Sequence, residues 1–444
     1  MIHSIKNIIR DSLGFLPLKL RFPKRFFDQL SQLQKGQWQS SEHIEVYQTA
    51  QLKALVDHAY RNVPYYTELF KQAHIQPSDI QTLKDLPKIP ILTKDLIRNN
   101  FDKLRAVNFS DKDVIILKTS GTTGKPLKIL YDKKKDYFNF DPFIWRFFSS
   151  VGCSLSDRLA SLADWRLPLN KISEFNRYRN RLFLSSYRLN PQTAVKYFQA
   201  MKKFNVKFLE GYPSSIELFS RYLVGEGMCC SNGLIKGIIV HSEQFSDYQR
   251  HLIEKFWGCP CFNWYGMEER AVLGYECEKH EGLHLCTDFG ITEFIPNHDL
   301  PMYDSIVVTS LTNWAMPLIR YETGDVGRLL DKSCSCGRNF PLFELIGGRI
   351  KNFVIAKDGS QIPVTNVDIP GATDHVIQFQ FVQTEIGKLV LKVQKNDLFS
   401  NNDLEKIRQI LCKKFGTNMD VDIQYTEKLS HIQSHKTPLL IQNL

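Results

Sequence analysis

The sequence lacks any long apolar segment, and it uses cysteine sparingly. No run of about eighteen apolar residues occurs, so we expect no helix that crosses a membrane. The start of the chain is mildly basic and apolar, but Asp11 and scattered polar residues interrupt any signal-peptide core. Because ten cysteines in 444 residues are too dilute for a disulfide scaffold, we expect the protein in a reducing cytoplasm.

Internal repeats, low-complexity tracts and nucleic-acid motifs are also missing. The composition, with 43% hydrophobic and 23% charged residues, is that of a globular protein, and the length favours about two or three domains. The net charge of +10 is modest and dispersed, and it suits a polyanion such as ATP or CoA as well as an anionic membrane surface. Phenylalanines interleaved with Arg and Lys over residues 21–27 leave peripheral membrane contact open, although an amphipathic helix packed on its own protein is the more common source of such a pattern.

The order of local patterns predicts an α/β protein. Residues 1 to about 100 are expected to be mainly helical, with a break at Val63-Pro64 and a proline-rich connector over residues 86–94. Strands and helices then alternate, which is typical of α/β architecture. The expected strands are residues 114–117, 128–131, 237–240, 378–383 and 388–393, and the expected helices include 51–60, one from Phe138, and 402–415.

We therefore expect a large N-terminal domain with mixed sheets and helices over residues 1–348. A small, mobile α+β domain would follow over residues 349–444. Gly347-Gly348 would supply the flexible joint between them, with the hinge near Lys351.

A loop rich in glycine and hydroxyl groups follows the first expected strand. Residues 118–126 have the sequence Lys-Thr-Ser-Gly-Thr-Thr-Gly-Lys-Pro, in which backbone N–H groups, hydroxyls and a lysine can together bind phosphate. The loop is not a Walker A motif, because Thr119 stands where that motif needs its first glycine. A polar turn after a strand is the alternative interpretation.

The loop resembles the signature of adenylate-forming enzymes, and four further segments agree with that superfamily in the expected order. These segments are Tyr265–Glu269, Pro317–Asp325, Gly347–Lys351 and Ser434–Lys436. Within the superfamily the closest resemblance is to the phenylacetate–CoA ligase and CapK-like branch. Residues 210–214, residues 241–243 and the cysteines after Tyr265 carry it.

The resemblance implies ATP-dependent activation of a carboxylic acid to an acyl-adenylate, followed by acyl transfer to a thiol, by default CoA. Its implied cofactors are ATP, Mg²⁺ and CoA. An amine or sugar acceptor in surface-polysaccharide biosynthesis is the first alternative, and a non-catalytic nucleotide-binding scaffold is the second. The implied partners are the carboxylate, ATP and the acyl acceptor; no nucleic acid is expected, and a homodimer stays open.

The resemblance also implies roles for individual residues. Lys436, Glu269 and Thr123 would be catalytic, with Glu269 holding Mg²⁺. ATP or AMP would bind Thr119, Ser120, Gly121, Thr122, Thr123, Gly124, Lys125, Ser242, Glu243, Tyr265, Gly266, Glu268, Asp325 and Arg349. The acid would contact Tyr212, Pro213, Ser214, His241 and Trp165.

Several of these positions depart from the superfamily's pattern or keep an alternative. Glu268 replaces the usual Ser or Thr, and His435 replaces the glycine before Lys436. Asp325, whose carboxylate suits a ribose diol, is alternatively a turn residue after Gly324.

Cysteine and histidine form a separate group. Cys277, His284, Cys334 and Cys336 supply the N and S ligands that suit tetrahedral zinc, and the resembled branch makes a structural zinc plausible here. His280 and Cys286 are reserve ligands. Buried thiols beside a hydrogen-bonded histidine are the alternative, and Cys259 and Cys261 are expected to be buried strand residues.

Overall fold

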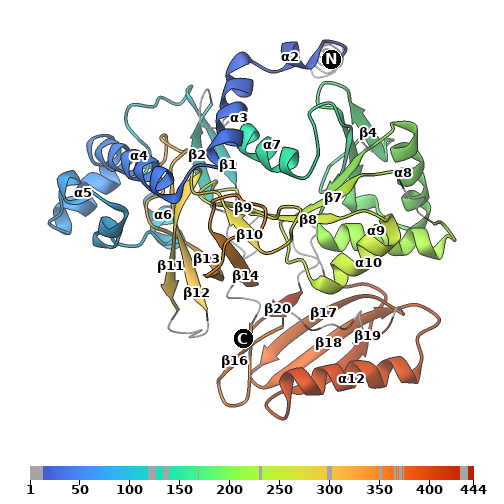
Figure 1. Cartoon of the computed structure of the whole chain (residues 1–444). Helices are drawn as coiled ribbons and strands as arrows, with labels where there is room; N and C mark the ends of the chain where they lie inside the picture. The colour runs from blue at the N-terminus through green and yellow to red at the C-terminus, as the bar shows by residue number, and fades with distance from the viewer. Residues whose placement is uncertain are drawn as a thin grey trace. The chain divides into compact units, whose positions relative to one another are not determined.

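The computed structural model describes the chain except residues 1–13, 119–126, 134–139, 169, 230–232, 298–302, 350–352, 365–366, 368, 370–372, 374 and 431–438. Contacts divide the chain into two compact units. The first unit combines Met1–Gly14, Asp157–Cys261 and Leu345–Leu444, and the second combines Phe15–Ser156 and Phe262–Glu344. Figure 1 shows their elements, and each unit is considered by itself.

The second unit begins with helices. They are α2 (Leu18–Arg21), α3 (Lys24–Gly36), α4 (Ser41–Asn62), α5 (Pro64–Gln72), η1 (Pro77–Asp79), η2 (Leu83–Lys88), α6 (Lys94–Asn99) and, later in the chain, α7 (Phe140–Ser150). Ser40 caps α4 by accepting a hydrogen bond from His43 N. The break after α4 falls where the sequence predicts it, because Val63 is extended and Pro64 occupies the first turn of α5.

The strands of the second unit are largely antiparallel. Neighbouring strands run in the order β11 (Gly290–Pro296), β12 (Asp304–Ser310), β13 (Tyr321–Leu329), β14 (Leu342–Arg349), β10 (Leu283–Leu285), β9 (Leu273–Tyr275) and β8 (Cys261–Gly266). A separate antiparallel pair joins β1 (Val114–Lys118) to β2 (Lys128–Asp132). Gly274 has to be glycine, since a Cβ there would lie 2.4 Å from the Phe343 ring.

Parallel strands form the middle of the first unit. β3 (Leu159–Ala163) pairs in parallel with β5 (Arg181–Ser185) and β6 (Phe208–Gly211), β6 pairs in parallel with β7 (Gly237–His241), and β4 (Ser173–Asn176) lies antiparallel to β5. Between them come η3 (Ser186–Arg188), α8 (Pro191–Lys203), α9 (Pro213–Gly225) and α10 (Asp247–Trp257). Strand β7 is buried over its apolar run, which explains why the sequence shows continuous hydrophobicity there rather than alternation.

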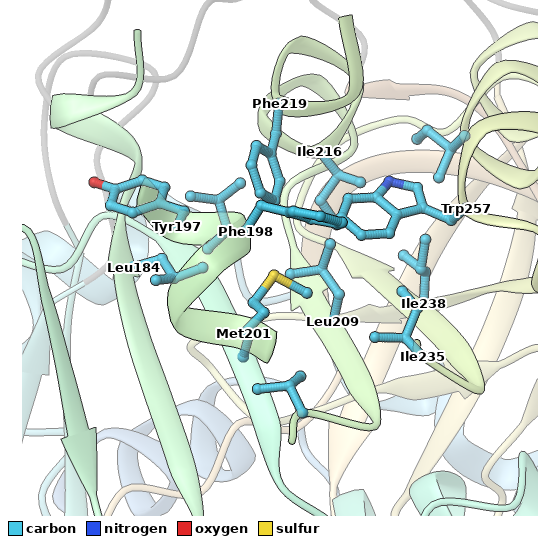
Figure 2. Packing of buried hydrophobic residues seen from close by; sticks show 14 of the residues in the cluster. Leu184, Tyr197, Phe198, Met201, Leu209, Ile216, Phe219, Ile235, Ile238 and Trp257 are labelled. Atoms are coloured by element: carbon cyan, nitrogen blue, oxygen red, sulfur yellow. The ribbon is translucent and has the colours of Figure 1, made fainter. Parts of the chain in front are cut away.

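The helices of this unit bury their apolar faces on the parallel strands. Figure 2 shows Phe198 and Met201 of α8, Phe219 of α9 and Trp257 of α10 packed together above Leu209 of β6. The indole nitrogen of Trp257 donates a hydrogen bond to Ser220 Oγ at 2.8 Å, so the largest side chain of this core has no unpaired donor. A dense core of this kind holds the strand ends in fixed positions.

The C-terminal part of the first unit is a small α+β region. Its sheet runs β19 (Asp420–Tyr425), β18 (Lys388–Lys395), β17 (Val376–Glu385) and β20 (Leu440–Gln442), beside a pair formed by β15 (Phe353–Ile355) and β16 (Gln361–Pro363). Helix α12 (Asn401–Phe415) packs Ile407, Leu411 and Phe415 into the same core as Phe381 and Leu391. The predicted α/β class with a smaller C-terminal α+β region is confirmed.

One sequence expectation changes, and another stays a prediction. Cys259 is buried but lies before strand β8, which begins at Cys261, because left-handed Gly258 ends α10 and Pro260 has no N–H for a strand ladder. Gly347-Gly348 lies in the last residues of β14, and Lys351 lies outside the described residues, so the hinge and the boundary at residue 348 stay predictions. Over the part of the chain that the structure describes, no helix is long and apolar enough to span a membrane.

Candidate functional site

Two motifs that are 60 residues apart meet in the second unit. Tyr265, near the end of β8, donates its phenol hydrogen bond to Asp325 Oδ2 of β13 at 2.7 Å. Gly266 beside it is required, since a Cβ there would lie 2.7 Å from the Trp264 ring. A carboxylate has about four lone-pair sites, so this bond leaves Asp325 able to accept further hydrogen bonds.

A second phenol–carboxylate pair joins β13 to the turn that follows β8. Tyr321, the first residue of β13, is fully buried and donates to Glu269 Oε1 at 2.7 Å. Glu269 is only 7% exposed, whereas its neighbour Glu268 is exposed and contributes its backbone oxygen to a bond from Tyr131. The two glutamates therefore differ, because Glu269 is buried and its carboxylate accepts a hydrogen bond from Tyr321, whereas Glu268 is exposed.

The segment that carries Asp325 is held from several sides. Gly324 has φ of +77°, and Thr323 Oγ1 accepts from Asp325 N at 3.0 Å while it donates to Ile306 O. Lys94 donates to Thr323 O. Arg320 has φ of +50° and is buried against Glu293 in a two-pronged ion pair. A non-glycine residue with positive φ is strained, so these contacts fix the motif at an energetic cost typical of functional sites.

In the first unit, the predicted acid-binding residues gather at one edge of the parallel strands. Trp165 follows β3, Tyr212 follows β6, and His241 ends β7. Because these strands are parallel, their carboxyl ends share an edge, which is where open α/β sheets bind ligands. The rings of Tyr212 and His241 are 5.8 Å apart, edge to face.

The imidazole of His241 lies between two oxygen-bearing side chains. Its Nε2 is 3.5 Å from Glu210 Oε1, and its Nδ1 is 2.8 Å from Ser242 Oγ. Burial opposes ionisation of Glu210, but Arg181 at 3.2 Å and His241 lower the pKa of that carboxyl to about 2. Ser242 has φ of +66°, a further non-glycine residue in the left-handed region.

The start of helix α9 is tied to the same strand edge. Pro213 occupies its first turn, and Ser214 N donates to Glu243 Oε2 at 3.1 Å, so Glu243 caps the helix. Burial, followed by the nearby carboxylates Asp164 and Glu243, raises the pKa of Tyr212. Tyr212 therefore stays a neutral hydroxyl group at any physiological pH.

The predicted zinc ligands converge. The four ligand atoms of Cys277, His284, Cys334 and Cys336 all lie within 4.8 Å of one another. Cys277 Sγ is 3.6 Å from Cys334 Sγ, too far for a disulfide bond of about 2.05 Å. Cys336 Sγ is 3.3 Å from His284 Nε2. A tetrahedral zinc with Zn–S near 2.3 Å sets these separations at about 3.5–3.8 Å, so the spacing fits the ion.

The electrostatics of this cluster suit a cation. Burial and the charge of Arg338 lower the pKa of His284 to about 4, so its imidazole is neutral, as a metal ligand must be. Burial raises the pKa of Cys277 and of Cys334. Burial also opposes ionisation of Cys336, but hydrogen bonds from Arg338 lower its pKa overall.

The two reserve ligands lie elsewhere. His280 stacks on Phe262 with ring centroids 5.2 Å apart and has Nδ1 at 3.4 Å from Glu276. Cys286 is fully buried, and burial raises its pKa to about 12. Neither belongs to the group of four.

Several predicted residues lie outside the described residues. They are the whole loop Thr119, Ser120, Gly121, Thr122, Thr123, Gly124 and Lys125, together with Lys436. The backbone of Arg349 ends β14, but nothing describes its side chain. The strands on either side of this loop in the sequence, β1 and β2, pair with each other.

The motifs of the sequence predict no role for Tyr321, Lys94 or Arg320. Tyr321 and Arg320 belong to the segment Pro317–Asp325, in which only the aspartate has a predicted role, and Lys94 belongs to the proline-rich connector. Their contacts span 52 residues for Tyr321 and 229 residues for Lys94. Leu92 of the connector also forms a parallel β-bridge with Tyr321, and no local sequence pattern predicts this contact.

Comparisons with known proteins show what this chain is similar to. Residues 354–443 match the model of the CapK C-terminal domain family. The chain is 25% identical to Protein CapK of Staphylococcus aureus, over 99% of this chain and 97% of CapK. It is 24% identical to the phenylacetate-coenzyme A ligase of Thermus thermophilus, over 87% of this chain and 92% of that protein. The chain is a relative of CapK and the phenylacetate–CoA ligases.

Solved structures agree on the fold. The chain aligns with 2-hydroxyisobutyryl-CoA ligase in complex with 2-HIB-AMP at a TM-score of 0.75, with 17% identity, over 91% of this chain and 90% of that one. The predicted resemblance to CapK and the phenylacetate–CoA ligases is confirmed. The names of these proteins also agree with the prediction of an AMP-forming, acyl-CoA ligase-like enzyme.

Proposed function

We propose that this protein activates a carboxylic acid with ATP and then transfers the acyl group to a thiol, with CoA as the acceptor. The observation that carries the proposal is the pair of bonds from Tyr265 to Asp325 and from Tyr321 to Glu269. Each of the two carboxylates that we assign to the nucleotide accepts a hydrogen bond from a phenol, Asp325 on β13 and Glu269 in the turn after β8. A surface without a binding or catalytic function would not need two buried or half-buried carboxylates that hydrogen bonds orient in this way.

In the first half-reaction, a carboxylate oxygen of the acid attacks the α-phosphorus of ATP. The new O–P bond forms the acyl-adenylate, and the bond to the β-phosphate oxygen breaks, so pyrophosphate leaves. Asp325 would accept hydrogen bonds from the ribose hydroxyls through the lone pairs that Tyr265 does not use. The loop of residues 119–125 would bind the departing pyrophosphate, with Thr123 donating a hydrogen bond.

Glu269 is the residue that would hold Mg²⁺. It fits the ion because it is a buried carboxylate with only one oxygen committed to Tyr321, while Glu268 is exposed. When bound, the metal stabilises negative charge on the phosphate oxygens. The chain's own contribution is orientation, because Tyr321 restrains the carboxylate before ATP arrives.

In the second half-reaction, the acceptor sulfur attacks the acyl carbon, a thioester forms, and AMP leaves. Lys436 would stabilise the first half-reaction and then withdraw through a hinge near Lys351, with Arg349 contacting ribose or phosphate. The acid would contact Trp165, Tyr212 and His241, which share one strand edge. Ser242 and Glu243, at the end of β7, would contact ATP.

The acceptor is the part of the proposal with a rival. CapK is a full-length relative, and an amine or sugar acceptor in surface-polysaccharide biosynthesis is the alternative that its likeness favours. Thioester and amide or ester products differ in one simple property, since only the thioester reacts rapidly with hydroxylamine at neutral pH. The product of the second half-reaction therefore identifies the acceptor class.

The test of the whole proposal is ATP–pyrophosphate exchange with a panel of aryl, fatty, amino and hydroxy acids. Exchange that depends on one acid, and falls in Asp325→Ala but not in the exposed control Asp397→Ala, supports the enzyme. A folded protein that exchanges with no acid yet binds ATP would instead support a nucleotide-binding scaffold. Mass spectrometry of products made with CoA then checks the acceptor.

We also propose that Cys277, His284, Cys334 and Cys336 bind one structural zinc. Three thiolates and the ion carry a net charge of about −1, and Arg338 beside Cys336 offsets it. Because Cys277 and Cys334 would otherwise hold protons, binding should release them, and affinity should fall at acid pH. Metal analysis of protein purified without added zinc tests this. Cys334→Ser should lose the metal, and the exposed control Cys412→Ser should keep it.

A further inference from the structure

Residues 15–27, which we call the basic apolar segment, have an unusual composition. The segment contains four cationic side chains and no acidic one, and every other residue in it is Phe, Leu or Pro. The cations are Lys19, Arg21, Lys24 and Arg25. The proposed reaction assigns no role to the segment.

The structure exposes part of this segment and anchors the rest. Helix α2 has no buried residue, and its Leu20 is 68% exposed, while Phe15, which precedes the helix, is 73% exposed. Lys19 and Lys24 are exposed as well. Exposed apolar side chains that gather within a few residues, with polar side chains around them, mark protein or membrane interaction sites.

An aromatic cluster keeps the segment in place on its own unit. The ring of Phe22 stacks on Phe26 with centroids 4.7 Å apart, and Phe26 is buried where α3 packs against α7. Arg21 Nε donates to Leu16 O at 2.7 Å and closes the turn before α2. Figure 1 shows α2 leading into α3, so the exposed side chains extend from a fixed base rather than from a loose tail.

We infer that the basic apolar segment docks this protein on an anionic lipid surface. Lysine and arginine would lie at the headgroups, and the phenyl and leucyl side chains would enter the boundary of the acyl chains. The four cations outnumber the one neighbouring carboxylate, the exposed Asp28 that follows the segment in α3, so the surface keeps a net positive charge that attracts anionic headgroups. A lipid surface also needs no shaped pocket.

The docking proposal is independent of the proposed reaction. It concerns residues that contact none of the carboxylates assigned to ATP, so variants in the segment should keep ATP–pyrophosphate exchange. Loss of exchange with lipid binding intact would count against the reaction only. Loss of lipid binding with exchange intact would count against the docking only.

The experiment is co-sedimentation of the full chain with vesicles of phosphatidylcholine alone and of phosphatidylcholine with phosphatidylglycerol. We expect binding to the anionic vesicles only, and weaker binding at high salt because the charges are screened. Lys19→Glu with Lys24→Glu should weaken binding about twentyfold or more, at about fivefold for each lost cation. Phe15→Ser with Leu20→Ser should weaken it about tenfold for each lost side chain.

Matched controls keep the test specific. Lys53→Glu with Lys71→Glu makes the same charge change on exposed lysines of the same unit, and Val46→Ser with Val107→Ser removes exposed apolar side chains elsewhere. Both controls should bind like the unchanged protein. No binding to anionic vesicles would overturn the proposal. If the lysine controls weaken vesicle binding equally, the binding is general charge attraction and the segment is not the docking site. If Phe15→Ser with Leu20→Ser leaves binding unaffected, the partner is a soluble polyanion or an acidic protein instead of a membrane.

Discussion

The hydrogen bond from Tyr321 to Glu269 offers the sharpest test of how this protein would hold magnesium. Tyr321→Phe removes one oxygen from a fully buried ring and leaves the ring itself in place. A hydrogen bond to a charged group contributes about 1.5–3 kcal/mol. Because the partner orients a proposed metal ligand, its loss should weaken metal affinity or activity about 10–100-fold.

The assay is ATP–pyrophosphate exchange as a function of free Mg²⁺. We expect Tyr321→Phe to raise the Mg²⁺ concentration for half-maximal exchange at least about tenfold, since Glu269 must then be ordered by the metal itself. Tyr265→Phe should instead weaken ATP binding without shifting the Mg²⁺ dependence, because its hydroxyl group bonds Asp325.

A control separates this role from stability. Tyr66 is another fully buried tyrosine of the same unit. Its hydroxyl group donates a hydrogen bond to Pro317 O at 3.1 Å and accepts one from Ile319 N at 2.9 Å, both backbone atoms. Tyr66→Phe should lower the free energy of unfolding and leave the Mg²⁺ dependence alone. If folded Tyr321→Phe and Tyr66→Phe show the same Mg²⁺ dependence as the unchanged protein, Glu269 does not hold the metal through Tyr321.

Further predictions address the nucleotide, the metal, the hinge and pH. Asp325→Ala should stay folded and lose about 1.5–3 kcal/mol of ATP binding, and calorimetry that finds equal affinity would remove its ribose role. Cys336→Ser should lower zinc content and thermal stability, so a zinc-free protein of unchanged stability would argue against a structural ion. Lys436→Ala should slow adenylation but spare transfer from a supplied acyl-adenylate, and Lys351→Pro should do the reverse; equal slowing of both steps by Lys436→Ala would contradict the two-state account. Glu210 has a folded-state pKa lowered from 4.5 to about 2, so its contribution to stability is present above pH 4.5 and is lost as the pH falls toward 2. In urea unfolding, the free energy of unfolding of Glu210→Gln should fall less than that of the unchanged protein as the pH is lowered from 4.5 toward 2.

Local patterns predicted the elements of this fold well where one stretch of chain decides its own structure. The apolar run 237–240 became buried strand β7, and α4 ended at Asn62 because Pro64 cannot follow in the same helix. The two strands expected over residues 378–383 and 388–393 became β17 and β18, joined through Gly387 with φ of +75°. Such features depend on nearby torsions and on burial, both of which a short sequence window records.

The predicted zinc ligands depend partly on local sequence and partly on tertiary packing. Residue type and order were enough to select Cys277, His284, Cys334 and Cys336, and the structure brought those four together. It also removed His280 and Cys286, whose rings and thiol pack against other side chains. Cysteine and histidine residues in a sequence indicate a metal site, but only tertiary packing decides which of the six candidate ligands lie close enough to share one ion.

Sequence by itself determined the class of this protein, the order of its motifs and the residue types that its chemistry would need. Only the tertiary structure decided which side chains meet. Tyr321 and Glu269 are 52 residues apart, and Lys94 lies 229 residues from Thr323, so strand register and the packing of separate segments set these contacts. The physical reason is that a hydrogen bond requires atoms about 3 Å apart, and for distant residues no local torsion controls that distance.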